Sequence, residues 1–238
     1  MFDLDDVKSA MAFGAHPDDE ILGPGGTLHR LSEKGAEVYV VTFTCGATAT
    51  NAPGRDQELA DKRVEEAKKT DHILGVSKRM ILDIPGQEVY NAVTGSNKLH
   101  HDLIRLIRTY RPQVLFTHSA DNHRDHAAIN MISSQSAFQA SESILGHLGE
   151  PCPSPLILYY GVELDVPEPN IIIEIGPMDL DAKRDAMKAQ LSQQRTDYLS
   201  RLLQNIDSRA KLYGARLGNG KLAEPFRIEY KSPLVVPY

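Results

Sequence analysis

The chain has 238 residues, of which 41% are hydrophobic and 24% are charged, and its formal net charge is −6. This length can bury a sizeable core, and no run reaches the roughly 18 apolar residues that a membrane helix needs. Because the net charge is modestly negative and the Lys and Arg residues are scattered, the sequence has no basic stripe for a nucleic acid. We therefore expect neither a nucleic acid nor a membrane as a partner.

The first ten residues and the two cysteines point to no particular function. Met1 to Ala10 has no cationic, apolar signal-peptide pattern, so a cytoplasmic location is expected by default. Cys45 and Cys152 are too few and too isolated for a disulfide framework or a cysteine zinc site, and we expect two buried thiols.

Short apolar, β-branched runs recur along the chain, each bounded by polar residues, glycine or proline, and they predict strands. These runs are Met11–Ala15, Val38–Thr44, Met80–Ile84, Val114–Thr117, Leu156–Tyr160 and Ile171–Ile175. Several are apolar throughout instead of alternating, which is typical of strands covered on both faces.

In the segments between these runs, apolar residues recur at helical spacing. This spacing predicts helices that stop before Gly75 and before Pro112, a third from about Asp125 to Leu148, and a long one from Asp179 to about Asn205. Strand and helix alternate almost throughout, which predicts an α/β fold: a Rossmann-like, three-layer α/β/α arrangement around a mostly parallel sheet. With no linker or repeat, we expect one domain over residues 1–238.

Two polar clusters directly follow predicted strands, Ala15–Glu20 after the first and His118–His126 after the fourth. In open α/β sheets ligands bind beyond the carboxyl ends of the strands, so both clusters are expected on one rim. Taken alone, the first could be a solvated acidic turn and the second a helix start capped by Asp125. Together they favour a metal site.

A hydrolytic zinc ion takes about three His or carboxylate ligands and keeps one position for water. His16, Asp19 and His126 could supply that set. Adjacent carboxylates cannot easily point the same way on a turn. One of Asp18 and Asp19 could therefore hold the metal while the other faces its water.

At this point the chain resembles the LmbE-like, or PIG-L-type, N-acetylglucosaminyl deacetylases. Ala15–Glu20 resembles the first signature of that family, and His123–His126 resembles the second, His-x-Asp-His. Arg63–Val76 matches more weakly, as the family helix that ends in Leu-Gly-Val. The resemblance implies that His16 and its two partners bind zinc and that Asp18 is the general base.

The resemblance also assigns the remaining catalytic roles. It implies that His123 stabilises the tetrahedral intermediate and that Asp125 orients or tunes it. An adjacent carboxylate favours the imidazolium, so Asp125 is expected to raise the pKa of His123. Arg55 stands where family members often place an arginine that contacts substrate.

Other candidates border this site. His118, at the end of the fourth strand, is expected to line the pocket, although it could merely close the strand. Gln190 stands near the position of a family histidine and is also expected at the substrate. Glu20 is either a support for a metal ligand or a surface carboxylate. Where many members have an acidic residue and glycine after the third strand, this chain has Pro85–Glu88.

The expected activity is hydrolysis of the acetamide of an N-acetylglucosamine-type sugar or a similar small N-acyl compound, by zinc-bound water with Asp18 as base. Two His and one carboxylate also fit a mononuclear iron(II) oxygenase, which is the first alternative. A non-catalytic sugar-binding module of the same fold is the second. The expected cofactor is one zinc ion, with iron(II) as the alternative, the expected partner is a small N-acetylated molecule, and self-association is left open.

Overall fold

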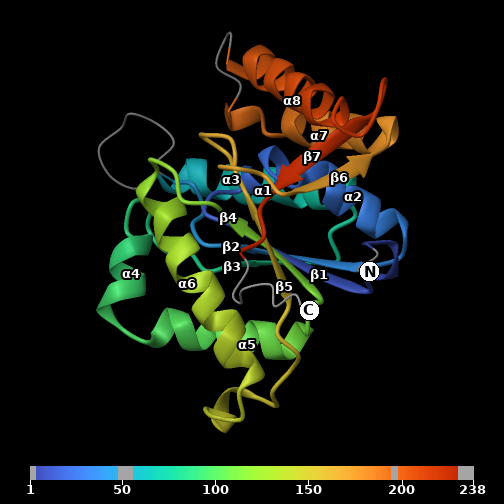
Figure 1. Cartoon of the computed structure of the whole chain (residues 1–238). Helices are drawn as coiled ribbons and strands as arrows, with labels where there is room; N and C mark the ends of the chain where they lie inside the picture. The colour runs from blue at the N-terminus through green and yellow to red at the C-terminus, as the bar shows by residue number, and fades with distance from the viewer. Residues whose placement is uncertain (1–3, 48–55, 194–197, 230–238) are drawn as a thin grey trace, which may run out of the picture.

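Figure 1 shows a computed structural model of the chain, which describes residues 4–47, 56–193 and 198–229. At its centre lies a sheet in the order β3-β2-β1-β4-β5 in which every neighbouring pair is parallel. The strands are β1 (Ser9–Gly14), β2 (Glu37–Thr42), β3 (Lys78–Ile81), β4 (Val114–His118) and β5 (Leu156–Tyr160). The mostly parallel sheet predicted from the apolar runs is therefore confirmed.

The apolar strands are explained by two cores, one on each face of the sheet. In β1, Met11 and Phe13 belong to one core, and Ala10 and Ala12 belong to the other. Side chains alternate between the faces of a strand, so a strand buried on both faces loses the polar positions of an amphipathic one.

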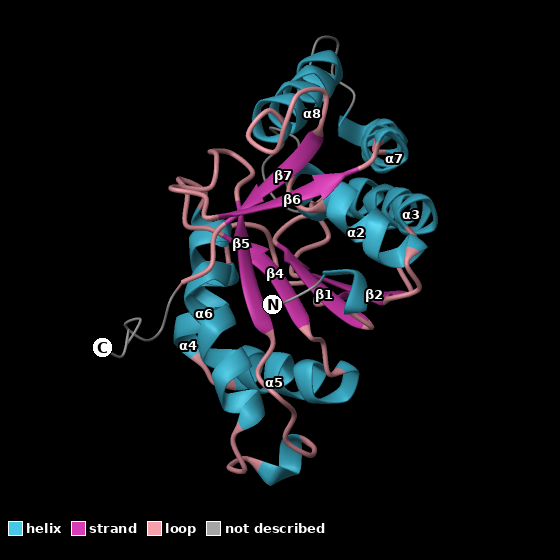
Figure 2. Cartoon of the chain, turned by 45° about the vertical axis from the view of Figure 1, so that its right-hand side comes forward, coloured by secondary structure: helices cyan, strands magenta, loops and turns pink. Residues whose placement is uncertain are grey.

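Helices cover both faces, as Figure 2 shows. The first core is closed by α4 (Val89–Gly95), α5 (Lys98–Tyr110) and α6 (Arg124–Ser141). The opposite face is covered by α2 (Gly25–Glu33), which α3 (Gln57–Leu74) and α7 (Pro177–Ala189) flank. The short α1 (Asp19–Leu22) lies at the carboxyl end of β1. None of the helices in the described ranges is both long and apolar enough to span a bilayer.

The C-terminal part forms a second, smaller sheet, seen at the top of Figure 1. There β6 (Ile171–Ile175) pairs antiparallel with β7 (Leu222–Phe226), and α8 (Tyr198–Gly214) packs on β7. The sixth predicted strand therefore lies outside the main sheet. Our sequence analysis missed β7, because Glu224 and Pro225 break its apolar pattern and proline is tolerated in an edge strand.

Two predicted helices were too long. The third ends at Ser141 because the Arg108 guanidinium donates to carbonyls at its end, and only a 3-10 turn, η2 (Gly146–Leu148), follows. The fourth ends at Ala189 and continues as η3 (Leu191–Gln193), with α8 as a separate helix. A third short turn, η1 (Leu4–Asp6), precedes β1.

Candidate metal centre and active site

The two polar clusters lie at the same edge of the sheet. β1 and β4 are parallel neighbours, and they end at Gly14 and His118. The chain then turns into α1, which begins at Asp19, and into α6, whose N-cap is His123. Segments more than a hundred positions apart are thereby brought together.

Three side chains converge on one point at this edge. Asp19 Oδ2 lies 3.3 Å from His16 Nδ1 and 3.6 Å from His126 Nε2. One ligand atom from each of the three lies within 4.8 Å of the others. Asp19 and His126 are buried, and the His16 side chain keeps 19% exposure. Asp19 Oδ2 also accepts from the His16 backbone N–H at 2.8 Å, which fixes the turn.

The charges of the cluster depend on one another. Burial would raise the pKa of Asp19, but the positive charges of His16 and His126 outweigh it and hold this pKa well below its usual range. Burial would lower the pKa of His16, but Asp19 and then Asp125 raise it to about 10. In the metal-free protein, protons on the imidazoles therefore balance the buried carboxylate.

This donor set fits a divalent cation. His126 Nε2 is buried and has no hydrogen-bond partner among the described residues, yet it is directed at the Asp19 carboxylate. Two imidazoles and one carboxylate are a usual ligand set for hydrolytic zinc. A second set, His16 with His123 and Asp125, also has its ligand atoms close together. It fits less well, because Asp125 already accepts hydrogen bonds from Gln87 N and from Val89 N.

Two carboxylates lie beside the imidazole nitrogens that point away from Asp19, and they orient the two rings. Asp121 Oδ2 lies 2.7 Å from His126 Nδ1, and both side chains are 1% exposed. Asp125 Oδ2 lies 3.6 Å from His16 Nε2. Metal-ligating histidines commonly direct their second nitrogen at a carboxylate in this way. Our sequence analysis did not single out Asp121, although its place in the second cluster was a signal.

Two expected substrate contacts are fully buried. His118 Nε2 accepts from the Ala15 N–H at 3.1 Å and lies 3.2 Å from Asp19 Oδ2. Burial lowers the pKa of His118 to about 4, so this imidazole is neutral. Gln190 Nε2 donates to Pro17 O and to Thr70 Oγ1. In this structure both side chains support the His16–Asp19 turn and neither reaches open space.

The second aspartate of the turn has a different partner. Asp18 Oδ2 lies 3.0 Å from Nη2 of Arg63 in α3, and the Arg63 side chain is only 3% exposed. The sequence placed Arg63 at the start of a helical family segment and gave no sign of this contact, because the contact depends on how α3 packs. Arg55, the arginine that was singled out, lies outside the described residues.

His123 lies beside these groups but does not have the charge expected from the sequence. Its pKa is lowered by burial and by the positive charges of His16 and His126, which outweigh the opposite effect of Asp125. Asp125 does favour the imidazolium, as expected, but the net shift of the His123 pKa is downward. His123 Nδ1 accepts from the Asp125 N–H, and Nε2 faces the Gln87 side chain at 3.2 Å. Gln87 was not among the site residues predicted from the sequence.

Glu20 is neither a support for a metal ligand nor a surface carboxylate, the two roles expected from the sequence. It is fully buried, and its Oε1 accepts from Arg79 Nη2 at 2.6 Å in an ion pair that Arg79 shares with Asp71. Burial raises the pKa of Glu20, and the positive charge of Arg79 opposes that shift. Glu20 therefore fastens α1 to β3.

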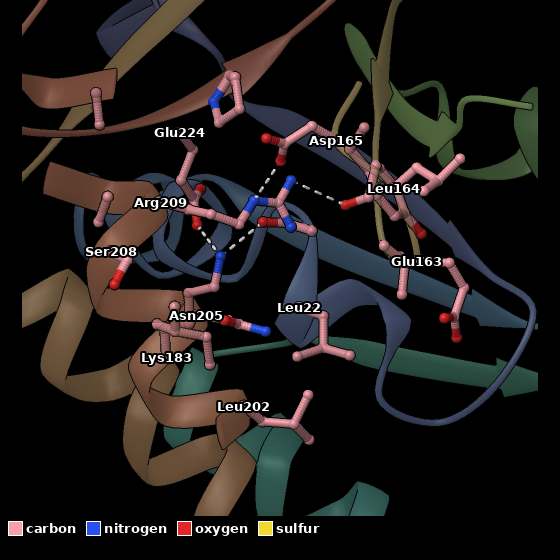
Figure 3. A pocket seen from close by; sticks show the side chains of 18 of the residues that line it. Leu22, Glu163, Leu164, Asp165, Lys183, Leu202, Asn205, Ser208, Arg209 and Glu224 are labelled. Carbon is pink, nitrogen blue, oxygen red and sulfur yellow. Dashed lines mark hydrogen bonds and ion pairs between the residues drawn. The ribbon is translucent and has the colours of Figure 1, made fainter. Parts of the chain in front are cut away.

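A separate cavity of about 370 Å³ lies between α8, the smaller sheet and the loop that follows β5. Figure 3 shows side chains that line it. Four of its charged groups form two ion pairs: Lys183 Nζ contacts Glu224 Oε1 at 2.5 Å and donates to Gly23 O, and Arg209 pairs with Asp165. Tyr160 lines this cavity, and its hydroxyl donates to Phe13 O. The side chains that line the cavity therefore connect α7, α8 and β7 to the rest of the fold through these contacts.

Comparison with known proteins places the chain in a family. Residues 11–137 match the family model described as PIG-L: GlcNAc-PI de-N-acetylase. The chain is 30% identical over 167 residues to a 1D-myo-inositol 2-acetamido-2-deoxy-alpha-D-glucopyranoside deacetylase of Streptomyces avermitilis, which covers 60% of this chain and 56% of the relative. It is 30% identical over 128 residues to a diacetylchitobiose deacetylase of Thermococcus kodakarensis, covering 52% of this chain and 46% of the relative.

The chain thus spans about half the length of these curated relatives. A solved structure resembles it over nearly all of its length. This is an N,N'-diacetylchitobiose deacetylase from Pyrococcus horikoshii complexed with an inhibitor, with a TM-score of 0.83, 26% identity, and coverage of 98% of this chain and 91% of that one. The chain therefore belongs to the PIG-L family, as its two His- and Asp-rich motifs predicted.

Proposed function

We propose that the protein is a zinc-dependent N-deacetylase, which hydrolyses the acetamide of an N-acetylglucosamine-type sugar or a similar small N-acyl compound. The observation that supports this most is the convergence of His16, Asp19 and His126, with the carboxylate of Asp18 next to them. The named activities of the relatives, all deacetylations of amino sugars, agree with this choice of reaction.

The bound ion would supply Lewis-acid chemistry, polarising the amide carbonyl and lowering the pKa of water. Asp18 accepts a proton from the attacking water and passes it to the departing amine. His123 acts as a donor to the substrate carbonyl: its Nδ1 accepts from the Asp125 N–H, which leaves Nε2 to carry the ring proton once the substrate oxygen replaces the Gln87 amide nitrogen that lies 3.2 Å away. A preorganised donor of this kind stabilises the charge that develops on the carbonyl oxygen.

The remaining residues have supporting roles in this proposal. Asp121 and Asp125 orient the two ligand imidazoles, and His118 and Gln190 hold the turn from beneath. Arg55 is still proposed as a substrate contact, on the family resemblance alone.

The test is amine release from a panel of N-acetylated amino sugars by the zinc-loaded protein. Asp18→Asn is expected to keep zinc and lose about 100-fold or more in kcat, because it removes the general base. His126→Ala is expected to lose zinc, measured by metal analysis after dialysis. Asp181→Asn is the matched control, since this carboxylate is exposed and, among the residues that the structure describes, pairs with Arg184 of the same helix.

Other outcomes would contradict the proposal. Release of no amine from any sugar of the panel, with zinc bound and the fold intact, would favour a binding module. Iron in anaerobically purified protein, together with oxygen consumption, would favour an oxygenase. Equal zinc loss in Asp18→Asn and His126→Ala would show that Asp18 is a ligand and not the base.

A further inference from the structure

Buried arginines in this fold normally use their donors. Arg108, 4% exposed, donates to six backbone carbonyls around the end of α6. Arg79 donates to Asp71, Thr42 and Glu20. Such bonds compensate for removing a guanidinium from water, which otherwise costs several kcal/mol.

Arg63 departs from this pattern. It is 3% exposed, but its Nε and Nη2 make no hydrogen bond among the described residues. These two nitrogens form one edge of the guanidinium, the edge that can hold a carboxylate with two parallel bonds. The nearest carboxylate is that of Asp18, whose Oδ2 lies 3.0 Å from Nη2 without hydrogen-bond alignment.

The backbone leaves room for this guanidinium. Gly46, in the loop after β2, has φ +69°, and a Cβ placed there would lie 2.6 Å from Arg63 Nη1 and 2.7 Å from its Cζ. Any larger residue would push the guanidinium aside and would also strain the backbone. Arg63 therefore lies under a loop that has no side chain at the point of contact.

From this geometry we infer that Arg63 is a positioning residue, which fixes the carboxylate of Asp18 through one oxygen and leaves the other free to accept a proton. The inference rests on the proposed function, in which Asp18 is the base. It explains how two adjacent aspartates take different roles: His16 N and the imidazoles hold Asp19, whereas Arg63 turns Asp18 the other way. An arginine stays charged at every working pH, so this contact persists.

The first test is Arg63→Met, with Arg108→Met as the matched buried control. Methionine fills a similar volume without unpaired donors, and the Asp18 carboxylate is 15% exposed and can turn to water, so Arg63→Met is expected to lower the melting temperature less than Arg108→Met does. Its kcat is expected to fall about 100-fold, the effect of misplacing a catalytic group by 1 Å, with KM and zinc content close to wild type. Arg108→Met is expected to show the reverse, the larger loss of melting temperature with kcat retained.

A second test leaves both charged residues in place. Gly46→Ala is expected to lower kcat in the same way, because the added methyl group displaces the guanidinium. Gly35→Ala is its control: Gly35 also has a positive φ, +84°, but nothing lies within 4 Å of a Cβ there. Recovery of kcat in Arg63→Ala on adding guanidinium ions would support positioning over a structural role.

Failure of the inference can be told from failure of the proposed function. If the wild-type protein releases no amine, the proposed function fails, and the Arg63–Asp18 contact is then tested by a double-mutant cycle on urea unfolding with Arg63→Met and Asp18→Asn. Additive effects in that cycle would overturn the inference. So would wild-type kcat in Arg63→Met, or loss of zinc in parallel with kcat.

Discussion

At the scale of single residues, the site is a set of paired nitrogens and oxygens in which each proposed ligand has its own support. His126 is held by Asp121 and His16 by Asp125, while Asp19 accepts from the backbone of the turn that contains it. This arrangement fixes which nitrogen of each imidazole would face a bound ion. The two predictions that follow concern metal affinity and not the chemistry of the substrate.

The first concerns Asp121. Asp121→Asn keeps the size of the side chain but removes the negative charge 2.7 Å from His126 Nδ1. Because outer supports of this kind change metal affinity by about 10- to 100-fold, zinc affinity should fall by that amount. Competition with a chelator of known affinity measures it. Asp102→Asn is the control, because Asp102 lies on the outer face of α5, where it pairs with Lys98 and Arg105. Unchanged zinc affinity would mean that His126 is oriented by packing alone.

The second concerns protons. The pKa of His16 is raised from 6.5 to about 10 in the metal-free protein, so this imidazolium stabilises the metal-free fold fully below pH 6.5 and loses that contribution as the pH rises through about 10. Between these values zinc must displace the proton. Calorimetry in buffers of different ionisation enthalpy should therefore show release of at least one proton per ion, and no release would contradict the assignment of His16 as a ligand.

At the scale of elements, the C-terminal sheet is fastened to the rest of the molecule by a buried ion pair. Glu224 of β7 accepts from the backbone N–H groups of Gly26 and Thr27 at the start of α2, and Lys183 of α7 completes its partners. The side chains of this pair are 7% and 4% exposed, so they cannot turn to water when the partner is lost.

Lys183→Met should therefore destabilise the fold by about 3–5 kcal/mol, since it leaves a buried carboxylate without its cation. Urea unfolding monitored by circular dichroism measures the change. Lys221→Met is the control, because Lys221 and Glu174 form a half-exposed pair worth about 0–1 kcal/mol. Equal effects of the two substitutions would show that the burial of Lys183 is unimportant.

At the scale of the whole molecule, a bound ion would join two segments that the pairing of β1 with β4 already brings close. An ion that binds only the folded state, present at 100 times its Kd, adds about 2.7 kcal/mol to the free energy of unfolding. For a chain of this size that corresponds to about 5–10 °C in Tm. Removal of zinc with a chelator should lower the Tm of the wild-type protein by this amount. The same chelator should leave the Tm of His126→Ala unchanged, because that variant is expected to have lost its zinc. A single domain and self-association remain proposals.

The sequence alone determined much of this description. Apolar runs located the five strands of the main sheet, and polar clusters directly after two of them located the candidate ligands. Both signals are local, because a strand buried on both faces must be apolar along its length and a site at the carboxyl edge must follow a strand directly. Two short motifs were enough to identify the family.

Only the tertiary structure decided what those residues touch. Arg63 reaches Asp18 because α3 packs beside α2, and Gln190 ends α7 with its side chain on Pro17 and Thr70. The direction of the pKa shift of His123 is set by neighbours from a distant segment as well as by Asp125 two positions away. Such effects depend on distances through space, and the order of residues along a chain does not contain those distances.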